Sequence, residues 1–418
     1  MTYEFEYLMH LVSVSAIGLP FELPKKELCW RRLFDLASEQ AVFALAAAAA
    51  RPVWNTLEVT LRQEVRAHLY SAIMAEETRT KAVWELMSWF QNEDIIPFAL
   101  LKGMGLAALY KTPELREYGD VDIYTGRKFE NRALALLQRH GVSITKRNPA
   151  QHESAGYHSD IGEIELHAYL FREEDRKLWF GRSEKYTDTI EPFICQTIDE
   201  KHRIPVLSVQ NNAEFLCLHF IKHFIREGIS IRNIVDLGLF LQEYGKEVNF
   251  DRLWELLTSL RYDGIIQTAL NICVDYFHMD ASRFIGYNEM DSETIHLFMD
   301  DTEQGGYLGA NERLERSRSA KAYEGVAFSG SEVAKGSKKW KKRRIFWERV
   351  YAAMPNKNEL RRKYKYVRNC DWLLPIAWAN HLISGSLRVV RATVSKANVK
   401  NERSSNERVT LFRRLGIM

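Results

Sequence analysis

Three acidic residues have the types and spacing of a metal site. Asp120 and Asp122 are separated by one residue in the segment YGDVDIYT, residues 118–125, whose alternating polar and apolar residues predict a strand. Side chains two positions apart on a strand share a face, so both carboxylates project from the same side. Glu165 lies in a second alternating segment, residues 161–170, and becomes a third carboxylate if the strands are neighbours. Carboxylate oxygens suit Mg²⁺, and we expect these residues to hold two Mg²⁺ ions around a phosphoryl group during in-line displacement.

A turn upstream of the first acidic strand predicts a phosphate-binding element. The apolar run at residues 95–101 indicates a buried strand that ends in the turn KGMG, residues 102–105, at the start of a short helix. Backbone N–H groups at such a turn favour phosphate, and basic side chains add charge. We therefore expect Lys102, Gly103 and Arg116 to bind the triphosphate of a nucleotide. Surface charge, or an ion pair with the two aspartates, is the structural alternative for both cations.

Helical segments frame these motifs on both sides. The chain has 418 residues, of which 46% are hydrophobic and 27% charged, which excludes a disordered protein and allows two or three domains. The apolar periodicity predicts a helical region at 1–91, an α/β core at 92–205, a helical domain at 206–300 and a basic extension at 301–418. The predicted fold class is α+β, with a small mixed sheet and flanking helices.

The order of the motifs resembles a known family. LKG at residues 101–103, Arg116 followed by Asp120 and Asp122, and IELH at residues 164–167 are similar to the bacterial uncharacterised nucleotidyltransferase family of the DNA polymerase β-like superfamily. The resemblance implies a polymerase-β-like core and Mg²⁺-dependent transfer of a nucleoside monophosphate from an NTP, such as ATP, to an acceptor, with release of pyrophosphate. The superfamily usually has a Gly-Ser turn, whereas this chain has Gly-Met at residues 103–104. The family pattern names no acceptor.

Further polar residues follow in the second helical region. His219 and His223 are four residues apart and share a helix face, which is a metal-ligand spacing, but no glutamate of a zincin motif lies between them. A packed or substrate-facing role in the second wall of the cleft is therefore favoured. Arg232 and Asp236 have the same spacing and predict a structural salt bridge. For His167, beside Glu165 on its strand, we expect a structural hydrogen bond with a carboxylate.

Composition predicts a cytoplasmic protein. The five cysteines are an odd number and widely spaced, as a reducing compartment allows. The first residues lack the basic segment of a signal peptide, and the most apolar run, residues 41–50, is shorter than the roughly 20 residues of a membrane span.

Basic residues concentrate at the C-terminal end of the sequence. Residues 311–418 hold 26 Lys or Arg and 9 Asp or Glu, whereas residues 1–310 hold 32 and 46. The segment 335–368 contains 14 Lys or Arg with interleaved aromatic residues. Three interpretations stay open: nucleic-acid binding, docking on an anionic membrane surface, and a helix that packs its aromatic face on the acidic body of the protein. Packing is favoured, and no feature indicates the oligomeric state.

Two functions from different classes follow from these motifs. The first is the nucleotidyltransferase, with protein nucleotidylation, including self-modification, as a variant of the same chemistry. The second is a binding protein with a degenerate nucleotidyltransferase core that docks on nucleic acid or membrane through residues 335–368. The intact Asp120, Asp122 and Glu165 favour the enzyme.

Overall fold

The computed structural model describes residues 1–92, 97–146, 153–171, 175, 194–197, 203–226, 228–305 and 407–417. The chain divides into two units, one of residues 1–224 and 228–309, the other of residues 225–227 and 310–418. The basic segment 335–368 lies outside the described residues, so its three interpretations remain predictions. The division of residues 1–300 into a core between two helical regions also remains a prediction.

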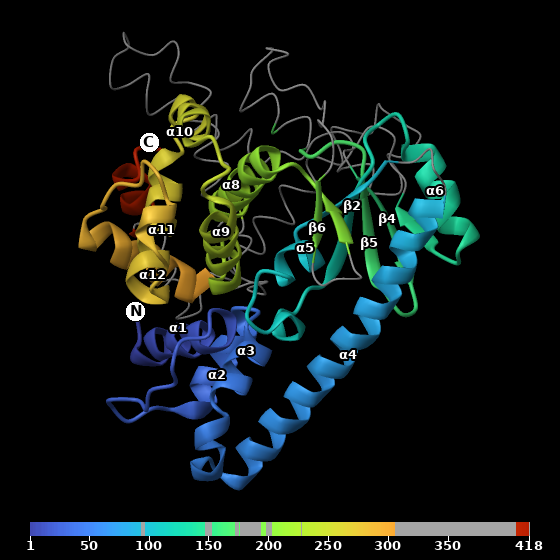
Figure 1. Cartoon of the computed structure of the whole chain (residues 1–418). Coiled ribbons are helices and arrows are strands. Elements are labelled where there is room, and N and C mark those ends of the chain that lie inside the picture. The colour runs from blue at the N-terminus through green and yellow to red at the C-terminus, as the bar shows by residue number, and fades with distance from the viewer. Residues whose placement is uncertain are drawn as a thin grey trace, which may run out of the picture. The chain divides into compact units, whose positions relative to one another are not determined.

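Helices build the N-terminal part of the first unit. The Ala-rich run that begins at Ala41 forms the buried helix α3, which packs between α1 and α4. The helix α4 is 34 residues long, and Figure 1 shows it running from these helices to the sheet. The elements are α1 (Tyr3–Ala16), α2 (Trp30–Glu39), α3 (Phe43–Ala49), the 3₁₀ turn η1 (Arg51–Thr56) and α4 (Val59–Asn92).

The unit contains a five-stranded mixed sheet, in the order β1-β2-β5-β4-β3. The strand β2 runs parallel to β5, and the other neighbours are antiparallel. The two predicted acidic strands are confirmed as β2 and β5. The apolar spacing of residues 129–140 and the glycine after them also predict a helix, and the structure has α6 there. The elements are β1 (Ala99–Leu101), α5 (Gly103–Ala107), η2 (Pro113–Leu115), β2 (Asp120–Tyr124), α6 (Glu130–Arg139), β3 (Ser143–Lys146), β4 (Glu153–His158) and β5 (Gly162–His167).

One face of this sheet belongs to the hydrophobic core. Val121 and Ile123 of β2 and Ile164 and Leu166 of β5 are buried with apolar side chains of α4 and α6. Figure 1 shows α6 and the end of α4 on one side of the sheet, with α5, α8 and α9 on the other. The alternation of the strands therefore sends the intervening polar residues toward the second side.

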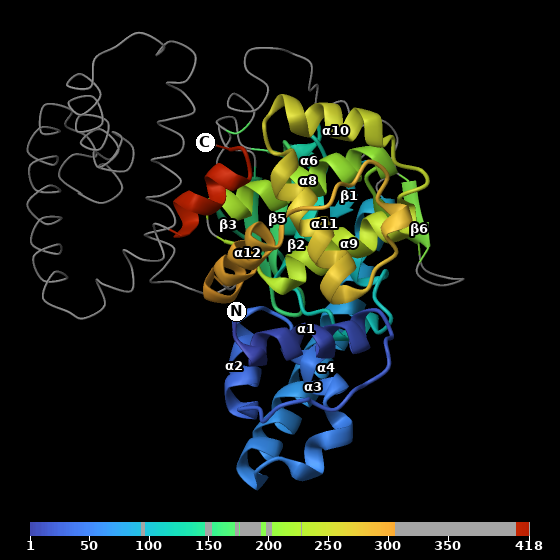
Figure 2. The ribbon, with the colours of Figure 1, turned by 90° about the vertical axis from the view of Figure 1, so that its left-hand side faces the viewer.

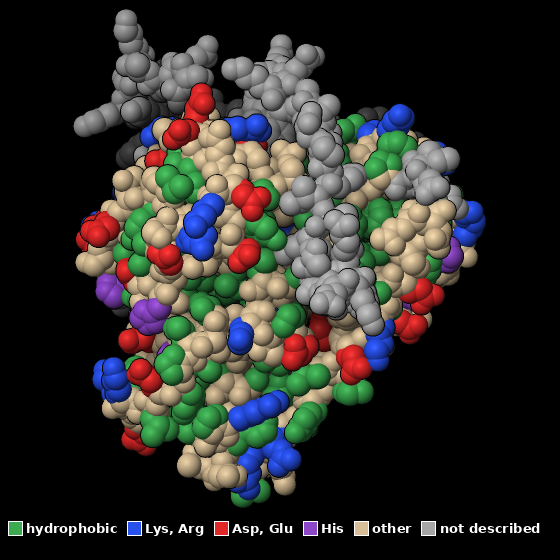
Figure 3. Space-filling view, in the orientation of Figure 1, with side chains coloured by type: hydrophobic (Ala, Val, Ile, Leu, Met, Phe, Trp, Pro, Cys, Tyr) green, Lys and Arg blue, Asp and Glu red, His purple; other side chains and the backbone are tan. Residues whose placement is uncertain are grey.

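Helices follow the sheet, and a second, two-stranded sheet pairs β6 (Ile194–Thr197) with β7 (Arg203–Val206). Figure 2 shows α9 to α12 gathered above the N-terminal helices. On the face seen in Figure 3, basic and acidic side chains of the described residues are intermixed. In the described part of the chain, no helix is both long and apolar enough to cross a bilayer. The helices are α8 (Val209–Arg226), α9 (Ile231–Tyr244), α10 (Phe250–Ser259), α11 (Asp263–Phe277), η3 (Ala281–Arg283) and α12 (Ser292–Gly305).

Candidate active site

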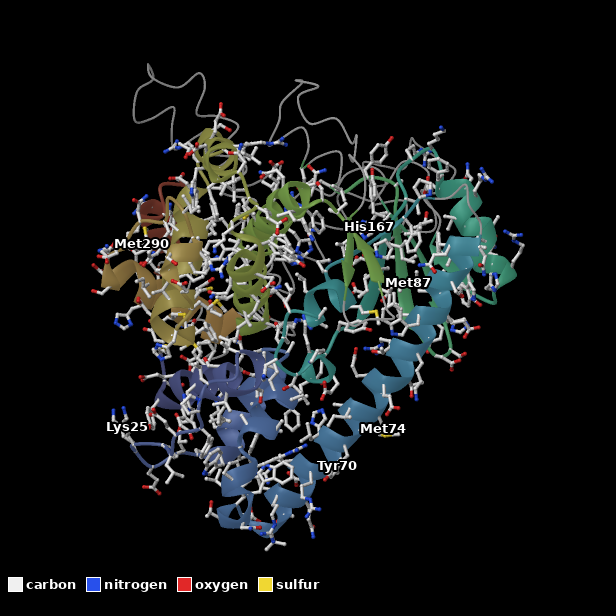
Figure 4. The ribbon with its side chains drawn as sticks, in the orientation of Figure 1. Lys25, Tyr70, Met74, Met87, His167 and Met290 are labelled. Carbon is white, nitrogen blue, oxygen red and sulfur yellow. The ribbon has the colours of Figure 1, made fainter. Side chains whose placement is uncertain are left out.

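The parallel pairing of β2 and β5 brings the acidic residues together. Asp122 lies opposite Glu165 in the register, so their side chains leave the same face of the sheet, away from the core. Among the described residues, ligand atoms of Asp122, Glu165 and His167 lie within 4.8 Å of one another. Asp120 lies outside this group, two residues earlier on the same face of β2. Figure 4 labels His167 at the sheet.

Both oxygens of Asp122 are engaged by positively polarised groups. The Nε2 of His167 is 2.8 Å from Oδ1, and the ammonium of Lys102 is 2.9 Å from Oδ2. Burial by itself raises the pKa of Asp122, but Lys102 and His167 outweigh it and hold the pKa well below its ordinary value. Asp122 is therefore a buried carboxylate that stays ionised at neutral pH.

Negative charge is concentrated around Glu165. Burial, the carboxylate of Asp122 and that of Glu153 raise the pKa of Glu165 to about 7. Glu153 comes from β4, where it pairs in the register with His167, and it is buried. Close carboxylates on one rigid face are stabilised when a cation lies between them, and the donor set of two carboxylates and one imidazole fits a divalent ion. No local pattern singles out Glu153, because the residues around it do not predict the strand β4.

Lys102 reaches this face from a strained turn. Its backbone has φ 54° and ψ −129°, a conformation that L-residues rarely adopt, and the helix α5 begins at the next residue. Burial lowers the pKa of Lys102, but the carboxylates of Asp122, Asp120 and Glu165 outweigh that effect and raise the pKa overall. The ion pair between Lys102 and Asp122 is the structural alternative considered from the sequence. The turn thus delivers a charged ammonium to the acidic face.

Arg116 has a different environment from the one expected. Its Nε and Nη2 each lie 2.7 Å from one carboxylate oxygen of Asp236 in α9, and its Nη1 donates to the carbonyl of Gly103 at 3.0 Å. The side chain is 3% exposed. The hydroxyl of Tyr110, which no sequence motif indicates, also donates to Asp236. Instead of standing open to a triphosphate, Arg116 ties the turn that carries Lys102 to the helix α9.

The helical residues predicted near the cleft lie on α8 and α9. The Nε2 of His219 is 3.2 Å from the ammonium of Lys102 and 3.1 Å from the Nε2 of His223. Burial and the neighbouring ammonium hold the pKa of His219 well below its ordinary value, so the ring is neutral. The sequence predicts a salt bridge between Arg232 and Asp236; the ion pair of the structure joins Asp236 to Arg116, and Arg232 donates to the carbonyl of Glu117.

Comparison with known proteins places the chain in a family. The family model described as "Uncharacterised nucleotidyltransferase" matches residues 26–278. A search of curated proteins gave no match. Among solved structures, the chain is similar to the lincosamide antibiotic adenylyltransferase LnuA in its lincomycin-bound crystal structure, at 15% identity and a TM-score of 0.28, over 38% of this chain and 94% of that one. The match to the family model covers more than half of the sequence and includes both acidic strands, and the chain belongs to this nucleotidyltransferase family.

Proposed function

We propose that the protein transfers a nucleoside monophosphate from an NTP to an acceptor, with Mg²⁺ as cofactor and pyrophosphate as the second product. The observation that supports this proposal most directly is the registered pair of Asp122 and Glu165 on one face of two parallel strands, with Lys102 beside it. The family is one of nucleotidyltransferases, and we place the transfer reaction at the acidic face because its carboxylates can bind the metal that the reaction needs.

The reaction assigns a role to each residue at this face. Asp120, Asp122 and Glu165 would hold two Mg²⁺ ions, which when bound neutralise charge on the phosphate oxygens and orient the acceptor. His167 donates a hydrogen bond to Asp122 and fixes the direction of that carboxylate. The acceptor oxygen forms a bond to the α-phosphorus, the bond to the pyrophosphate oxygen breaks, and the acceptor proton passes to a base, for which Glu165 is the candidate.

The turn at residues 102–105 would meet the triphosphate. Lys102 supplies a cation there, and the backbone N–H groups after it supply donors in place of the serine hydroxyl found in the superfamily. Arg116 would act without contacting the nucleotide. It donates a hydrogen bond to the carbonyl of Gly103 and so fixes the position of the turn. The acceptor is a hydroxyl, a phosphate or a protein side chain.

Nucleotide binding and transfer can be measured on the purified full chain. Each NTP, labelled at the α-phosphate, is incubated with and without Mg²⁺, and binding, pyrophosphate release and label on added acceptors are recorded. We expect Mg²⁺-dependent binding that is lost in Asp120→Ala/Asp122→Ala and kept in Asp160→Asn, which removes an exposed carboxylate from the turn between β4 and β5. Intact mass after NTP treatment detects self-modification. Metal-independent binding that the double variant shares with the wild type would leave only the binding-protein interpretation.

A further inference from the structure

Both oxygens of the Asp122 carboxylate already have a nitrogen donor beside them. Its Oδ1 accepts from His167 at 2.8 Å and its Oδ2 from Lys102 at 2.9 Å, and its side chain is only 3% exposed. Each oxygen keeps a second lone pair, but a divalent ion that binds this buried carboxylate meets the positive charge of Lys102 beside it, so its entry is opposed unless the ammonium moves away.

Lys102 is the donor that can leave. His167 is a short, buried side chain on β5, two residues from Glu165, with its ring packed in the sheet face. Lys102 carries its ammonium on four flexible carbons, and its side chain is 22% exposed. Its backbone is held, because Arg116 binds the carbonyl of the next residue, Gly103, at 3.0 Å. Movement of the ammonium therefore takes place by rotation of the side chain about a fixed Cα.

A second partner for the ammonium is already in place. The Nε2 of His219 lies 3.2 Å from the Nζ of Lys102, on the side of α8. The same nitrogen lies 3.1 Å from the Nε2 of His223. A neutral imidazole has one acceptor lone pair, so Lys102 and His223 compete to donate to this nitrogen. When Lys102 donates to this nitrogen, His223 does not, and when Lys102 turns away, His223 can donate in its place. The nitrogen of His219 therefore has a donor in both arrangements.

We propose that Lys102 acts as a built-in competitor for the divalent ion at Asp122, and that His219 is a positioning residue that receives the ammonium when the ion binds. The inference rests on the proposed metal binding by Asp122 and adds to it a cost of metal entry set by Lys102. In the metal-free protein the ammonium compensates the acidic face. Once displaced onto His219 it stays within reach of the same site, where it adds positive charge for a bound triphosphate.

The affinity for Mn²⁺, a paramagnetic substitute for Mg²⁺, tests the inference without nucleotide or turnover. Titrations followed by electron paramagnetic resonance would compare the wild type with Lys102→Met, His219→Leu and the double variant. We expect Lys102→Met to bind Mn²⁺ about tenfold more tightly, which corresponds to about 1.4 kcal/mol. His219→Leu should weaken binding severalfold, because the ammonium loses its alternative partner. In the Lys102→Met background the same change should have no effect, since there is no ammonium to receive.

Matched variants separate this mechanism from general effects. Lys81→Met removes the same charge from an exposed pair with Glu77 on α4 and should leave the affinity unchanged. His219→Gln, whose amide oxygen can accept from Lys102, should restore most of the affinity. Lys102→Gly also removes the ammonium and suits the positive φ, so it reports the same effect if Lys102→Met unfolds.

Each outcome bears on a definite claim. Equal or weaker Mn²⁺ binding by Lys102→Met and Lys102→Gly would overturn the competition, and an equal effect of His219→Leu in both backgrounds would show that His219 has only a structural role. Asp122→Asn locates the ion: binding that survives this change lies elsewhere and contradicts the proposed metal site itself. If neither the wild type nor the Lys102 variants bind Mn²⁺, both the site and the competition are refuted.

Discussion

The buried ion pair between Arg116 and Asp236 joins the segment before β2 to the helix α9, and its removal tests how the sheet and the following helices are held together. The two residues are 120 positions apart, one before β2 and the other in α9, and both nitrogen–oxygen distances are 2.7 Å. The side chains are 3% and 10% exposed. Burial lowers the pKa of Arg116, but Asp236 outweighs it and raises the pKa. The guanidinium also stays charged when its partner changes, because arginine is effectively always protonated in proteins.

The substitution Asp236→Asn keeps the volume and one acceptor oxygen but removes the negative charge. Loss of one member of a buried pair costs about 3–5 kcal/mol, because the other charge is left uncompensated. That is a large share of a folding free energy of about 5–15 kcal/mol. Arg116→Met should cost a similar amount, since the buried carboxylate of Asp236 loses the cation that compensates its charge. The double variant removes both charges of the pair and leaves neither uncompensated, so we expect it to lose about 2–3 kcal/mol less than the sum of the single changes.

Equilibrium unfolding in urea, followed by far-UV circular dichroism, measures these free energies. All four proteins need the same dependence of the unfolding free energy on urea for the comparison to hold. A cost below about 1 kcal/mol for Asp236→Asn would refute the assigned buried charge pair, since exposed pairs contribute that little. Additivity of the two single changes within about 0.5 kcal/mol would equally contradict direct coupling.

Three further substitutions test local features. At Lys102, glycine should give a protein about 1–3 kcal/mol more stable than alanine does, because only glycine takes its backbone conformation without strain; thermal unfolding of the two variants measures this, and equal stability contradicts it. Burial raises the pKa of Glu76 to about 7 against an ordinary 4.5, so the folded state binds a proton more tightly and stability should fall by up to about 3 kcal/mol as pH rises from about 4.5 through 7. Glu76→Gln should reduce that loss of stability in unfolding titrations at several pH values, while Glu165, whose pKa is also raised to about 7, still contributes to it. A variant with an unchanged pH dependence would contradict the raised pKa of Glu76. At Gly238, an added Cβ would lie 2.6 Å from the sulfur atoms of Cys273 and Met279, so alanine should cost about 1–3 kcal/mol in urea unfolding, whereas an unchanged midpoint would mean that the two sulfurs move aside freely.

The elements that carry the acidic residues were predictable because their signals are local. The alternation at residues 118–125 and 161–170 predicts strands, and the structure has β2 and β5 there. The apolar face of α6 and the glycine that follows it, Gly141 at φ 85°, likewise predict a helix and its end. The strand β4 was missed, since the segment ESAGYH has few of the β-branched residues typical of strands.

The roles of the basic residues depended on contacts that no local pattern contains. The spacing of Arg116 before Asp120 suggested a phosphate ligand, whereas its partner is Asp236 in a helix far along the chain. The position of Lys102 in the turn predicts that it binds phosphate, and the structure shows its ammonium between Asp122 and His219. His219 and His223 share a helix face as their spacing predicts, but the approach of Lys102 to that face comes from the folding of β1 and α5.

By itself, the sequence determined the family, the α+β fold class and the residues that can carry charge at the acidic face, because composition, alternation and motif spacing are properties of neighbouring residues. Only the tertiary structure decided that β2 lies parallel to β5, which sets Asp122 beside Glu165. It also decided that the ammonium of Lys102 lies between Asp122 and His219. Contacts between residues that are 20 to 120 positions apart depend on how the chain closes its loops and fills its core, and a linear pattern does not specify that closure.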